Sequence, residues 1–363
     1  MTLAAPTTNP LADDLAHILA HTGGIWENLR DQNVFVTGGT GFFGRWLLES
    51  FAHANYALKL NARMVVLSRN PSRFAQEAPH LGESASIHFV RGDVQTFDAA
   101  EVRAQLDVDA PGRYAFVIHA ATDASAKLNS ENPLLMIDTI LRGTRAALEF
   151  AVATGASRFL LMSTGAVYGR QPPEMTHIPE EYTGGPDPTN PNSAYGEGKR
   201  LAELLCACFH KHYRIEPVIA RCFAFVGPGL PLDSHFAIGN FIKDALDGKP
   251  IQVKGDGTPR RSYLYAADLT TWLWKLLIKG RAGAAYNVGS DEALTVGEAA
   301  ALVASVGGRL AVDFQCQPPI AVSGDFYVPS IRRAAVELGL KPTINLRSAI
   351  QKTISWHKGM TVL

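Results

Sequence analysis

A run of glycines between a short apolar segment and an amphipathic segment constrains this fold more than any other feature of the sequence. Val34–Val36 leads into Thr37–Gly44 (TGGTGFFG), and the helix-like segment Arg45–His53 follows. Strand, glycine-rich turn and helix in this order form the setting in which a dinucleotide pyrophosphate binds. Glycine at positions 38 and 41 lets the backbone approach the phosphates, and Gly44 lets the helix pack closely on the strand. Because the spacing is G-x-x-G-x-x-G, a purely structural tight turn is the alternative.

The alternation of apolar strands with helices continues beyond this turn. Strands are predicted at Met64–Leu67, Ile87–Val90, Phe116–Ile118, Phe159–Met162 and Tyr286–Val288, and a long helix at Pro133–Thr154. Uninterrupted apolar strands of this kind are typical of a parallel sheet with helices on both faces. We therefore predict an α/β fold, with a Rossmann-type doubly wound parallel sheet and a smaller C-terminal α/β lobe.

The length of 363 residues predicts about two domains. We expect residues 31–222, together with about 264–291, to form the dinucleotide-binding domain, and residues 223–263 and 292–363 to form a substrate-binding lobe. Residues 1–30 are predicted to be a helical extension, because Leu11, Leu15 and Ile18 recur at helical spacing. The Pro- and Gly-rich stretch Gln171–Pro191 is predicted to be a loop of the kind that forms a lid or a substrate rim.

Composition excludes several classes of function. The 34 Lys and Arg residues balance 34 Asp and Glu residues, so a large nucleic-acid or anionic-membrane footprint is not expected. The four cysteines lack zinc-finger spacing, and the 11 histidines show no paired spacing beside a glutamate, so no metal site is predicted. No apolar run approaches 18 residues and no signal peptide is recognised, which predicts a cytoplasmic protein with no membrane span.

A tyrosine and a lysine form the second chemical signal. Tyr195 and Lys199 lie four residues apart and share one face of a helix. An ammonium about 4 Å from a phenol, at an effective dielectric constant near 20, is worth about 4 kcal/mol. That energy could lower the phenol pKa by about three units, so that Tyr195 acts as acid or base near neutral pH. An ordinary helix face is the alternative.

A hydroxyl pair forms the third signal. Ser163 and Thr164 end the predicted strand at Phe159–Met162, about 30 residues before Tyr195. A hydroxyl there could bind the same substrate oxygen as the phenol, whereas a helix cap or a strand-end hydrogen bond is the alternative.

Together these signals resemble the extended short-chain dehydrogenase/reductase family, which includes the nucleotide-sugar epimerases and dehydratases. The resemblance covers roughly residues 32–357 and rests on Thr37–Gly44, Gly92-Asp93-Val94, His119-Ala120-Ala121, Gly143-Thr144, Ser163–Gly169, Tyr195–Lys199 and Gly227-Pro228. The set of motifs and their order are specific for the family and much less specific for the reaction.

The resemblance implies roles for individual residues. Thr164, Tyr195 and Lys199 would be catalytic, with Lys199 also holding the nicotinamide ribose. Asp93 would approach the adenine, Arg261 would bind the substrate diphosphate, and Asn240 would contact the diphosphate-sugar. The full set of implied cofactor-binding residues is Gly38, Thr40, Gly41, Phe42, Phe43, Gly44, Ser68, Arg69, Asp93, Val94, His119, Ala120, Ala121 and Lys199. A surface ion pair is the alternative for Arg261, and a helix cap is the alternative for Asn240.

Several positions depart from the family pattern. Ser68-Arg69 stands where an NAD enzyme usually has an acidic residue for the ribose 2′-hydroxyl, so NADP is slightly preferred over NAD. Gly165-Ala166 follows Thr164, where 4,6-dehydratases have acidic or Asp-Lys side chains, decarboxylases a glutamate and 3,5-epimerase-reductases a cysteine. Ile140 and Ala224 replace usual asparagines, and Phe326 and Ser330 replace a usual Arg and Asp.

The function implied is NAD(P)-dependent hydride transfer at C4 of a nucleotide-diphosphate sugar, with a C4-epimerase preferred. Small residues at Gly165-Ala166 are similar to those of C4-epimerases and of simple 4-keto reductases. An NADPH-dependent 4-keto-sugar reductase is the alternative, and a non-catalytic NAD(P)-binding sensor or scaffold is an alternative of another class. The nucleotide base and the sugar stay open. Family analogy further predicts a homodimer formed through the long helices.

Overall fold

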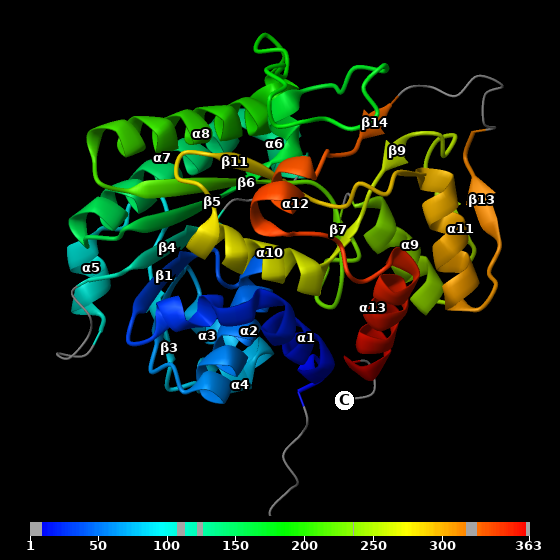
Figure 1. The fold of residues 1–363 in the computed structure, drawn as a ribbon. Helices are drawn as coiled ribbons and strands as arrows, with labels where there is room; N and C mark the ends of the chain where they lie inside the picture. Colours follow the sequence, from blue (N-terminus) through cyan, green and yellow to red (C-terminus); the bar gives the residue numbers. More distant parts are fainter. Residues whose placement is uncertain (1–8, 107–112, 122–125, 235, 317–324, 361–363) are drawn as a thin grey trace, which may run out of the picture.

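The computed structural model describes residues 9–106, 113–121, 126–234, 236–316 and 325–360, and within them a seven-stranded parallel sheet lies at the centre (Figure 1). Its strands are β1 (Asn33–Thr37), β2 (Arg63–Ser68), β3 (Ile87–Arg91), β4 (Phe116–His119), β5 (Arg158–Thr164), β6 (Glu216–Cys222) and β11 (Ala285–Val288). Their order is β11-β6-β5-β4-β1-β2-β3, and every neighbouring pair is parallel. The order reverses between β1 and β4, at the switch point where such sheets bind ligands. The predicted Rossmann-type α/β fold is confirmed.

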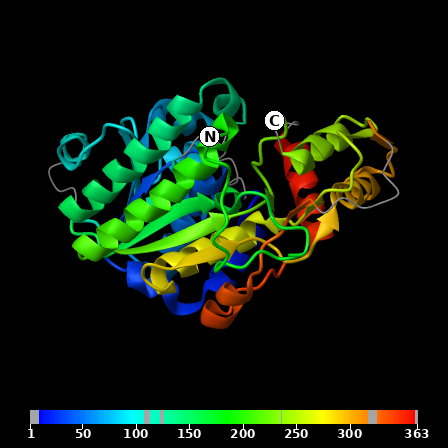
Figure 2. The same ribbon diagram turned by 90° about the horizontal axis from the view of Figure 1, so that it is seen from above.

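Both faces of this sheet are buried, which explains why its strands are continuously apolar. Val34 and Val36 join one apolar cluster, whereas Phe35, between them, joins the other. The first cluster includes α1 (Ala12–Thr22), α2 (Phe42–Leu58) and α10 (Ala266–Lys279), and the second includes α5 (Ala99–Ala104), α7 (Pro133–Ala153) and α8 (Ala194–His212). Figure 2, turned by 90°, shows α7 and α8 running side by side over the sheet. The layers are therefore helix, sheet and helix.

The remaining elements complete the described chain. The helices are α3 (Pro71–Glu77), α4 (Pro79–Gly82), α6 (Ala126–Glu131), α9 (Ala237–Leu246), α11 (Val296–Gly307), α12 (Arg332–Leu338) and α13 (Leu346–Met360), with 3-10 turns at Gly23–Leu29, Gly165–Tyr168 and Pro191–Ser193. In the small sheets β7 (Phe225–Val226) pairs with β10 (Leu264–Tyr265), β9 (Arg260–Arg261) lies between β12 (Leu294–Thr295) and β14 (Phe326–Tyr327), and β8 (Ile251–Val253) pairs with β13 (Val312–Phe314). Within these ranges, every helix is too short or too polar to traverse a lipid bilayer.

The predicted substrate lobe shares its core with the sheet. Helices α9, α11 and α13 pack against one another on the right of Figure 1. Phe241, Val303 and Ile350, one from each of these helices, belong to the same apolar cluster as Val34 of β1. The lobe and the sheet are therefore fastened together by continuous apolar packing, and the division at residues 222, 263 and 291 stays a prediction.

The predicted N-terminal helix is present as α1, and it is bound to the other end of the chain. Residues 1–8 lie outside the described part. The buried carboxylate of Asp14 accepts hydrogen bonds from the Tyr265 hydroxyl at 2.7 Å and from the Lys352 amine of α13 at 2.9 Å. Apolar Leu15 and Ile18 pack into the main core. This extension is thus an integral layer of the fold.

The segment Gln171–Pro191, which we call the rim segment, is a loop as predicted, and it is held in place by the C-terminal part of the chain. The side-chain oxygen of buried Gln171 accepts from the Val328 N–H at 3.0 Å. The Ile178 N–H donates to Val328 O, and the Ser330 N–H donates to Ile178 O, both at 2.9 Å. These bonds make the rim segment a fixed edge beside β14.

Candidate active site

The glycine turn is tight, as the sequence predicts. The structure gives a different reason for glycine at position 38 from the one predicted. Gly38 has φ 74°, and a Cβ there would lie 2.5 Å from the backbone of Ala120 and Ala121, which follow β4. A Cβ on Gly44 would lie 2.3 Å from the Gly38 carbonyl oxygen. Gly38 is thus required by the neighbouring strand end, whereas the prediction assigned it to clearance for phosphates. Gly44 packs as predicted.

Gly41 is the glycine that leaves open space. A Cβ there would have its nearest neighbour, the Gly38 carbonyl oxygen, at 3.6 Å. Helix α2 begins at Phe42 without a side-chain cap from the described residues, so its first N–H groups point out of the turn. The partly buried side chains of Phe42 and Phe43 pack on the apolar core, with Phe43 against Phe225. Such a helix start fits a dinucleotide pyrophosphate.

The predicted adenosine end of the site lies at the carboxyl ends of β2 and β3. Ser68 is buried, and its hydroxyl accepts from the Asn70 N–H at 3.3 Å. Arg69 and Asp93 are exposed, and Asp93 accepts from the Gln95 N–H at 2.9 Å. The arginine is therefore accessible to a ligand phosphate.

His119 ends β4 in the interior of the molecule. Its ring nitrogens bond the hydroxyls of Thr37 at 2.8 Å and Thr144 at 3.2 Å, joining β1, β4 and α7. Burial, together with the nearby Lys199 ammonium, lowers the pKa of His119 to about 3. His119 is therefore neutral at physiological pH, and Thr37, which it contacts, accepts from the Ala120 N–H at 3.0 Å. Val94 lies against Gly143 of α7 nearby.

The three predicted catalytic residues come together where β5 meets α8. Thr164 is the last residue of β5, and its hydroxyl accepts from the Ala166 N–H at 3.2 Å. Tyr195 lies in the first turn of α8, and the nearby Thr164 side chain acts to lower the pKa of its phenol. Lys199 follows one turn later, with its amine donating to the Met162 carbonyl oxygen at 2.6 Å. The hydroxyl pair and the amine thus share the carboxyl end of β5.

The electrostatics of Tyr195 correct one expectation. Burial raises the pKa of Tyr195, the neighbouring Tyr327 raises it further, and the nearby Thr164 side chain lowers it. The amine of Lys199, which was predicted to lower this pKa, donates to the carbonyl oxygen of Met162, and burial leaves the pKa of Tyr195 raised. Burial also lowers the pKa of Lys199 to about 8, although the nearby Cys222 and Glu203 favour its charged form. In this arrangement Tyr195 is a protonated phenol at neutral pH.

The two predicted substrate residues lie on separate elements. Arg261 of β9 is half-buried, and its guanidinium donates to Asp325 at 3.2 Å, which is the ion pair that the alternative interpretation expects. Asn240 is half-buried on α9, and among the described residues no hydrogen bond joins it to Arg261. Arg261 is linked to the hydroxyl site through Tyr327, which lies opposite it in the β9–β14 register and whose hydroxyl is 3.5 Å from that of Thr164.

Two residues near the site were not predicted. Asn129 of α6 accepts from the Tyr195 N–H at 2.9 Å and so fixes the start of α8. Tyr327 of β14 brings a third hydroxyl to Thr164 and Tyr195. No spacing in the sequence reveals Tyr327, since it is 163 residues from Thr164. The one hint in the sequence is that Tyr327 follows Phe326, a residue that departs from the family pattern.

Two departures from the family pattern have packing explanations. Ile140 is fully buried, and its Cδ1 would lie 3.0 Å from a Cβ on Gly198, so it fills the contact between α7 and α8. A Cβ on Gly165 would lie 2.7 Å from the Tyr327 hydroxyl and 2.8 Å from the ring of Phe223. Glycine at position 165 is thus required by these two rings.

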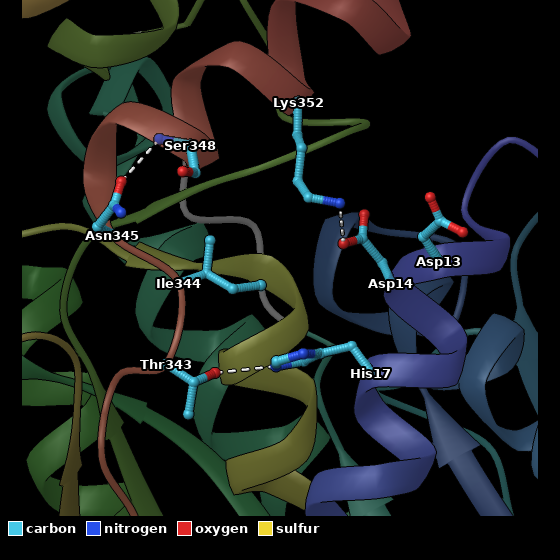
Figure 3. Close-up of a pocket in the computed structure, with 8 residues that line it drawn as sticks. All are labelled: Asp13, Asp14, His17, Thr343, Ile344, Asn345, Ser348 and Lys352. Carbon is cyan, nitrogen blue, oxygen red and sulfur yellow. Dashed lines mark hydrogen bonds and ion pairs between the residues drawn. The ribbon is translucent and has the colours of Figure 1, made fainter.

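A pocket of about 300 Å³ lies outside this site, between α1 and α13 (Figure 3). Its lining residues are Asp13, Asp14, His17, Thr343, Ile344, Asn345, Ser348 and Lys352. The Asp14–Lys352 ion pair and the bond between His17 and Thr343 cross it. None of the predicted site residues lines this pocket.

A parallel sheet with a glycine turn at its switch point, and a Tyr-x-x-x-Lys pair beside a strand-end hydroxyl, define a Rossmann-fold protein of the short-chain dehydrogenase/reductase type. The model of the NAD dependent epimerase/dehydratase family matches residues 34–289, and the chain belongs to this family.

Curated relatives include enzymes of two named activities. UDP-glucuronic acid decarboxylase 1 of Arabidopsis thaliana is 31% identical over 323 residues, which cover 89% of this chain and 69% of that protein. UDP-glucuronic acid decarboxylase 1 of Danio rerio is 33% identical, and the alignment spans 66% of this chain and 56% of that protein. The dTDP-glucose 4,6-dehydratase of Streptomyces niveus is 25% identical over 90% of this chain and 92% of that protein.

Solved structures with the same fold include epimerases. UDP-glucose 4-epimerase of Thermotoga maritima, determined with UDP-glucose, matches with a TM-score of 0.76 at 21% identity, covering 91% of this chain and 99% of that chain. UDP-glucose 4-epimerase of Thermus thermophilus, determined with NAD, matches with a TM-score of 0.73 at 26% identity, covering 90% of this chain and 99% of that chain.

Proposed function

We propose that this protein is a nucleotide-diphosphate-sugar C4-epimerase that works by NAD(P)-dependent hydride transfer. The observation that carries the proposal is the nearness of the Thr164 and Tyr195 side chains at the carboxyl end of β5, with Gly165 and Ala166 beside them. The hydroxyls suit an oxygen that gains and loses a proton, and the two small residues offer no acid or base for a second site on the sugar. The likeness to the UDP-glucose 4-epimerase of Thermus thermophilus adds support.

In this proposal Tyr195 first loses its proton to solvent, the phenolate then takes the proton of the sugar O4, and the phenol so formed returns that proton, while the Thr164 hydroxyl holds O4 by a hydrogen bond. A bound nicotinamide supplies the hydride acceptor and donor. Lys199, buried beside the hydroxyl pair, provides the positive charge that stabilises a phenolate when its amine turns from Met162 toward the ligand. The glycine turn and the open start of α2 hold the pyrophosphate.

Arg261 and Asn240 are proposed to hold the substrate diphosphate. The guanidinium of Arg261 presents paired N–H donors that match phosphate oxygens, and its salt bridge to Asp325 is partly exposed and available for exchange. Because Tyr327 lies between Arg261 and Thr164, a sugar that reaches both ends would pass over its ring.

The similarity to UDP-glucuronic acid decarboxylases does not carry their activity to this chain. The glutamate that such decarboxylases place after the Thr164 position corresponds to Ala166, or to the crowded Gly165. Neither residue can move a proton at C5 or C6 of a sugar.

An NADPH-dependent 4-keto-sugar reductase is the second candidate, favoured by Arg69. This exposed arginine follows β2, where it could pair with a 2′-phosphate, and Ser68 presents no carboxylate to repel one. NADP is therefore our slight preference for the cofactor, although the family and its neighbours are NAD-dependent or determined with NAD.

We also propose a homodimer formed through α7 and α8. Leu134 and Leu135 at the start of α7, and Leu201 and Leu204 of α8, are exposed apolar side chains on neighbouring helices. Exposed leucines gathered on two adjacent helices are typical of an association surface.

The test is turnover of nucleotide sugars by the purified protein. UDP-, dTDP-, GDP- and CDP-hexoses are incubated with the protein and either NAD⁺ or NADPH, and the products are separated by chromatography and identified by NMR. Interconversion of C4 epimers with no net change at 340 nm supports the epimerase, and stoichiometric oxidation of NADPH by a 4-keto sugar supports the reductase. Tyr195→Phe is expected to lower either activity by orders of magnitude and to leave cofactor binding intact. Near-normal turnover by this variant would refute the assignment. A cofactor that stays bound and that no sugar reduces or oxidises would favour the non-catalytic sensor.

A further inference from the structure

We infer that Arg221 is a positioning residue that ties the rim segment to helix α8, so that the rim segment is a fixed edge of the proposed sugar site and not a lid that closes over it. Arg221 acts through two sets of neighbours, of which one lies on α8 and the other supports the rim segment. The inference rests on the proposed function for the nature of the ligand, and it deepens that function because it names the contacts that shape the site before a ligand binds.

Three polar residues form a row across the carboxyl ends of three neighbouring strands. Arg221 of β6 is the register partner of Ser163 on β5 and of Asn287 on β11. The residues two positions earlier on each strand pack in the apolar cluster that includes α7 and α8, so the polar row faces the same helices. Ser163 and Asn287 are buried, and the Arg221 side chain is 16% exposed. A guanidinium in such a place requires partners for its N–H groups.

On one side of the row, Arg221 is bound to α8. Its Nη2 donates to the Glu203 carboxylate at 2.7 Å, and its Nε lies 3.1 and 3.2 Å from the two carboxylate oxygens. The Ser163 hydroxyl donates to the same carboxylate at 2.6 Å. Glu203 lies four residues after Lys199 and eight after Tyr195, on the same face of α8. This ion pair therefore holds the face of α8 that carries the proposed acid and base residues against β5 and β6.

On the other side, Arg221 reaches the rim segment through a tyrosine and an asparagine. Its Nη1 donates to the Tyr168 hydroxyl at 2.9 Å, and its Cζ lies 4.8 Å from the centroid of the Tyr168 ring. The Tyr168 hydroxyl donates to Asn287 Oδ1 at 2.7 Å. The Asn287 amide nitrogen then donates to the carbonyl oxygens of Ile178, at 2.9 Å, and of Ser330, at 3.1 Å. The polar atoms of both side chains are thus used in one continuous set of hydrogen bonds.

A carboxylate of the rim segment makes a second attachment. The side chain of buried Glu180 accepts from the Asn287 N–H at 2.9 Å, and the Glu180 carbonyl oxygen accepts from Arg221 Nη1 at 3.3 Å. A lid would have to leave these contacts whenever the site opens, and buried polar groups left without partners are costly. Segments that open readily have few buried contacts. The rim segment is therefore in place before a ligand arrives.

The rim segment passes this constraint on to β14. Val328 is bonded to Gln171 and Ile178 of the rim segment. The residue before it, Tyr327, has its hydroxyl oxygen 3.5 Å from that of Thr164. The contacts of Arg221 thus support the strand that lies beside the proposed reaction centre.

Amide hydrogen exchange in the protein without ligand tests the role of Arg221. Replacing Arg221 itself would leave the buried Glu203 charge without its partner, so its neighbours are changed instead. The reporters are the N–H groups of Ile178 and Ser330, which donate to the carbonyl oxygens of Val328 and Ile178 at 2.9 Å. Tyr168→Phe keeps the ring and removes the hydroxyl that joins Arg221 to Asn287. It is expected to speed exchange of both reporters by about tenfold, while β5 keeps its protection.

A remote variant separates positioning from a local loss of structure. Glu203→Gln weakens the hold on Arg221 from the α8 side, where the carboxylate is bonded to Ser163 and Arg221. It is expected to speed exchange of the rim reporters by about threefold. Tyr114→Phe is the matched control, because it removes a buried hydroxyl that has no hydrogen-bond partner among the described residues, and it should leave the reporters unchanged. Unchanged exchange in Tyr168→Phe, or no effect of Glu203→Gln, would overturn the inference.

Exchange with ligand distinguishes an edge from a lid. UDP, dTDP, GDP and CDP are each added together with NAD⁺, and calorimetry identifies which of them bind. Protection of the two reporters is expected to change less than about threefold on binding. A gain of about tenfold or more would show a segment that closes on the ligand and would refute a fixed edge. The comparison of variants needs no ligand and decides the role of Arg221 by itself.

Kinetics separate this inference from the proposed function. Tyr168→Phe is expected to raise KM for the nucleotide sugar by about fivefold and to change kcat less than about twofold, because Tyr195 and Lys199 stay on a helix that is still bonded to Met162. If no nucleotide sugar is turned over, the proposed function fails, and hydrogen exchange still decides the role of Arg221. If turnover is present and the reporters do not respond to the variants, only the role of Arg221 fails.

Discussion

The amine of Lys199 donates a 2.6 Å hydrogen bond to the carbonyl oxygen of Met162, two residues before Thr164 on β5. This bond fastens α8 to the central sheet at the level of the hydroxyl pair. A buried amine at this position lowers the stability of the fold while it serves the site, because burial lowers its pKa to about 8.

The first prediction concerns the stability contributed by Lys199. Because its folded pKa is below the unfolded value of 10.5, the unfolded chain binds the proton more tightly, and stability rises with pH between about 8 and 10.5. The free energy of unfolding should therefore gain about 2 kcal/mol from this group between pH 7 and 9.5. Urea denaturation at both pH values checks this. Lys199→Met should lose this gain and most of the activity, and an equal gain in the variant would contradict the assignment.

The second prediction concerns acid stability and His119. Its folded pKa of about 3 lies below the unfolded value of 6.5, so the unfolded chain gains a proton that the folded chain refuses as the pH falls through 6.5. Protonation of His119 in the unfolded chain should therefore lower the free energy of unfolding by about 2 kcal/mol at pH 5 relative to pH 8. Comparing urea midpoints of His119→Asn and of the exposed control His212→Asn tests it. The pH dependence should shrink only in His119→Asn.

The third prediction contrasts two glycines of the turn. Gly44→Ala should lower the free energy of unfolding by about 2 kcal/mol or more, because its Cβ would meet the Gly38 oxygen at 2.3 Å. Gly41→Ala should change stability by less than about 0.5 kcal/mol, since its surroundings are open, and should weaken dinucleotide binding roughly tenfold or more. Thermal unfolding and calorimetric titration with NAD⁺ and NADP⁺ measure both effects. Unchanged cofactor affinity in Gly41→Ala would show that the pyrophosphate does not bind at this turn.

The fourth prediction concerns the choice of cofactor. Arg69→Ser should weaken NADP⁺ binding by about 10- to 100-fold, which is the loss expected for a charged hydrogen bond, and should leave NAD⁺ affinity nearly unchanged. Arg73→Ser is the matched control, because that arginine is exposed and already paired with Glu77 at 2.8 Å. Equal losses for both cofactors would show that Arg69 does not read the 2′-phosphate.

The fifth prediction concerns the proposed homodimer. Leu204→Glu places a charge among the exposed leucines of α7 and α8 and should convert the dimer to a monomer in light-scattering measurements. Val336→Glu is the control, since Val336 is 77% exposed on α12, away from these helices. A wild-type protein that is monomeric at high concentration would remove the basis of this proposal.

The local sequence pattern predicted the central sheet well. It did not predict contacts between residues that lie far apart in the sequence. The glycine turn, the strands and the Tyr195–Lys199 face are encoded in short stretches, where spacing alone determines geometry. Tyr327 and Asn129 reach Thr164 and Tyr195 from elements that the sequence cannot place relative to one another. The direction of the Lys199 amine was also unpredictable, because it depends on a backbone carbonyl of a neighbouring strand.

The clasp between Asp14 of α1 and Lys352 of α13 joins the two extremes of the described chain. Helix α13 in turn packs on α9, which carries Asn240. Trimming the first thirty residues would strip the carboxylate from both Lys352 and Tyr265 and uncover part of α10. In such a shortened polypeptide the packing of α13 and α9, near the C-terminal end, would be disturbed most. This is the part of the molecule where the sugar nucleotide is proposed to bind.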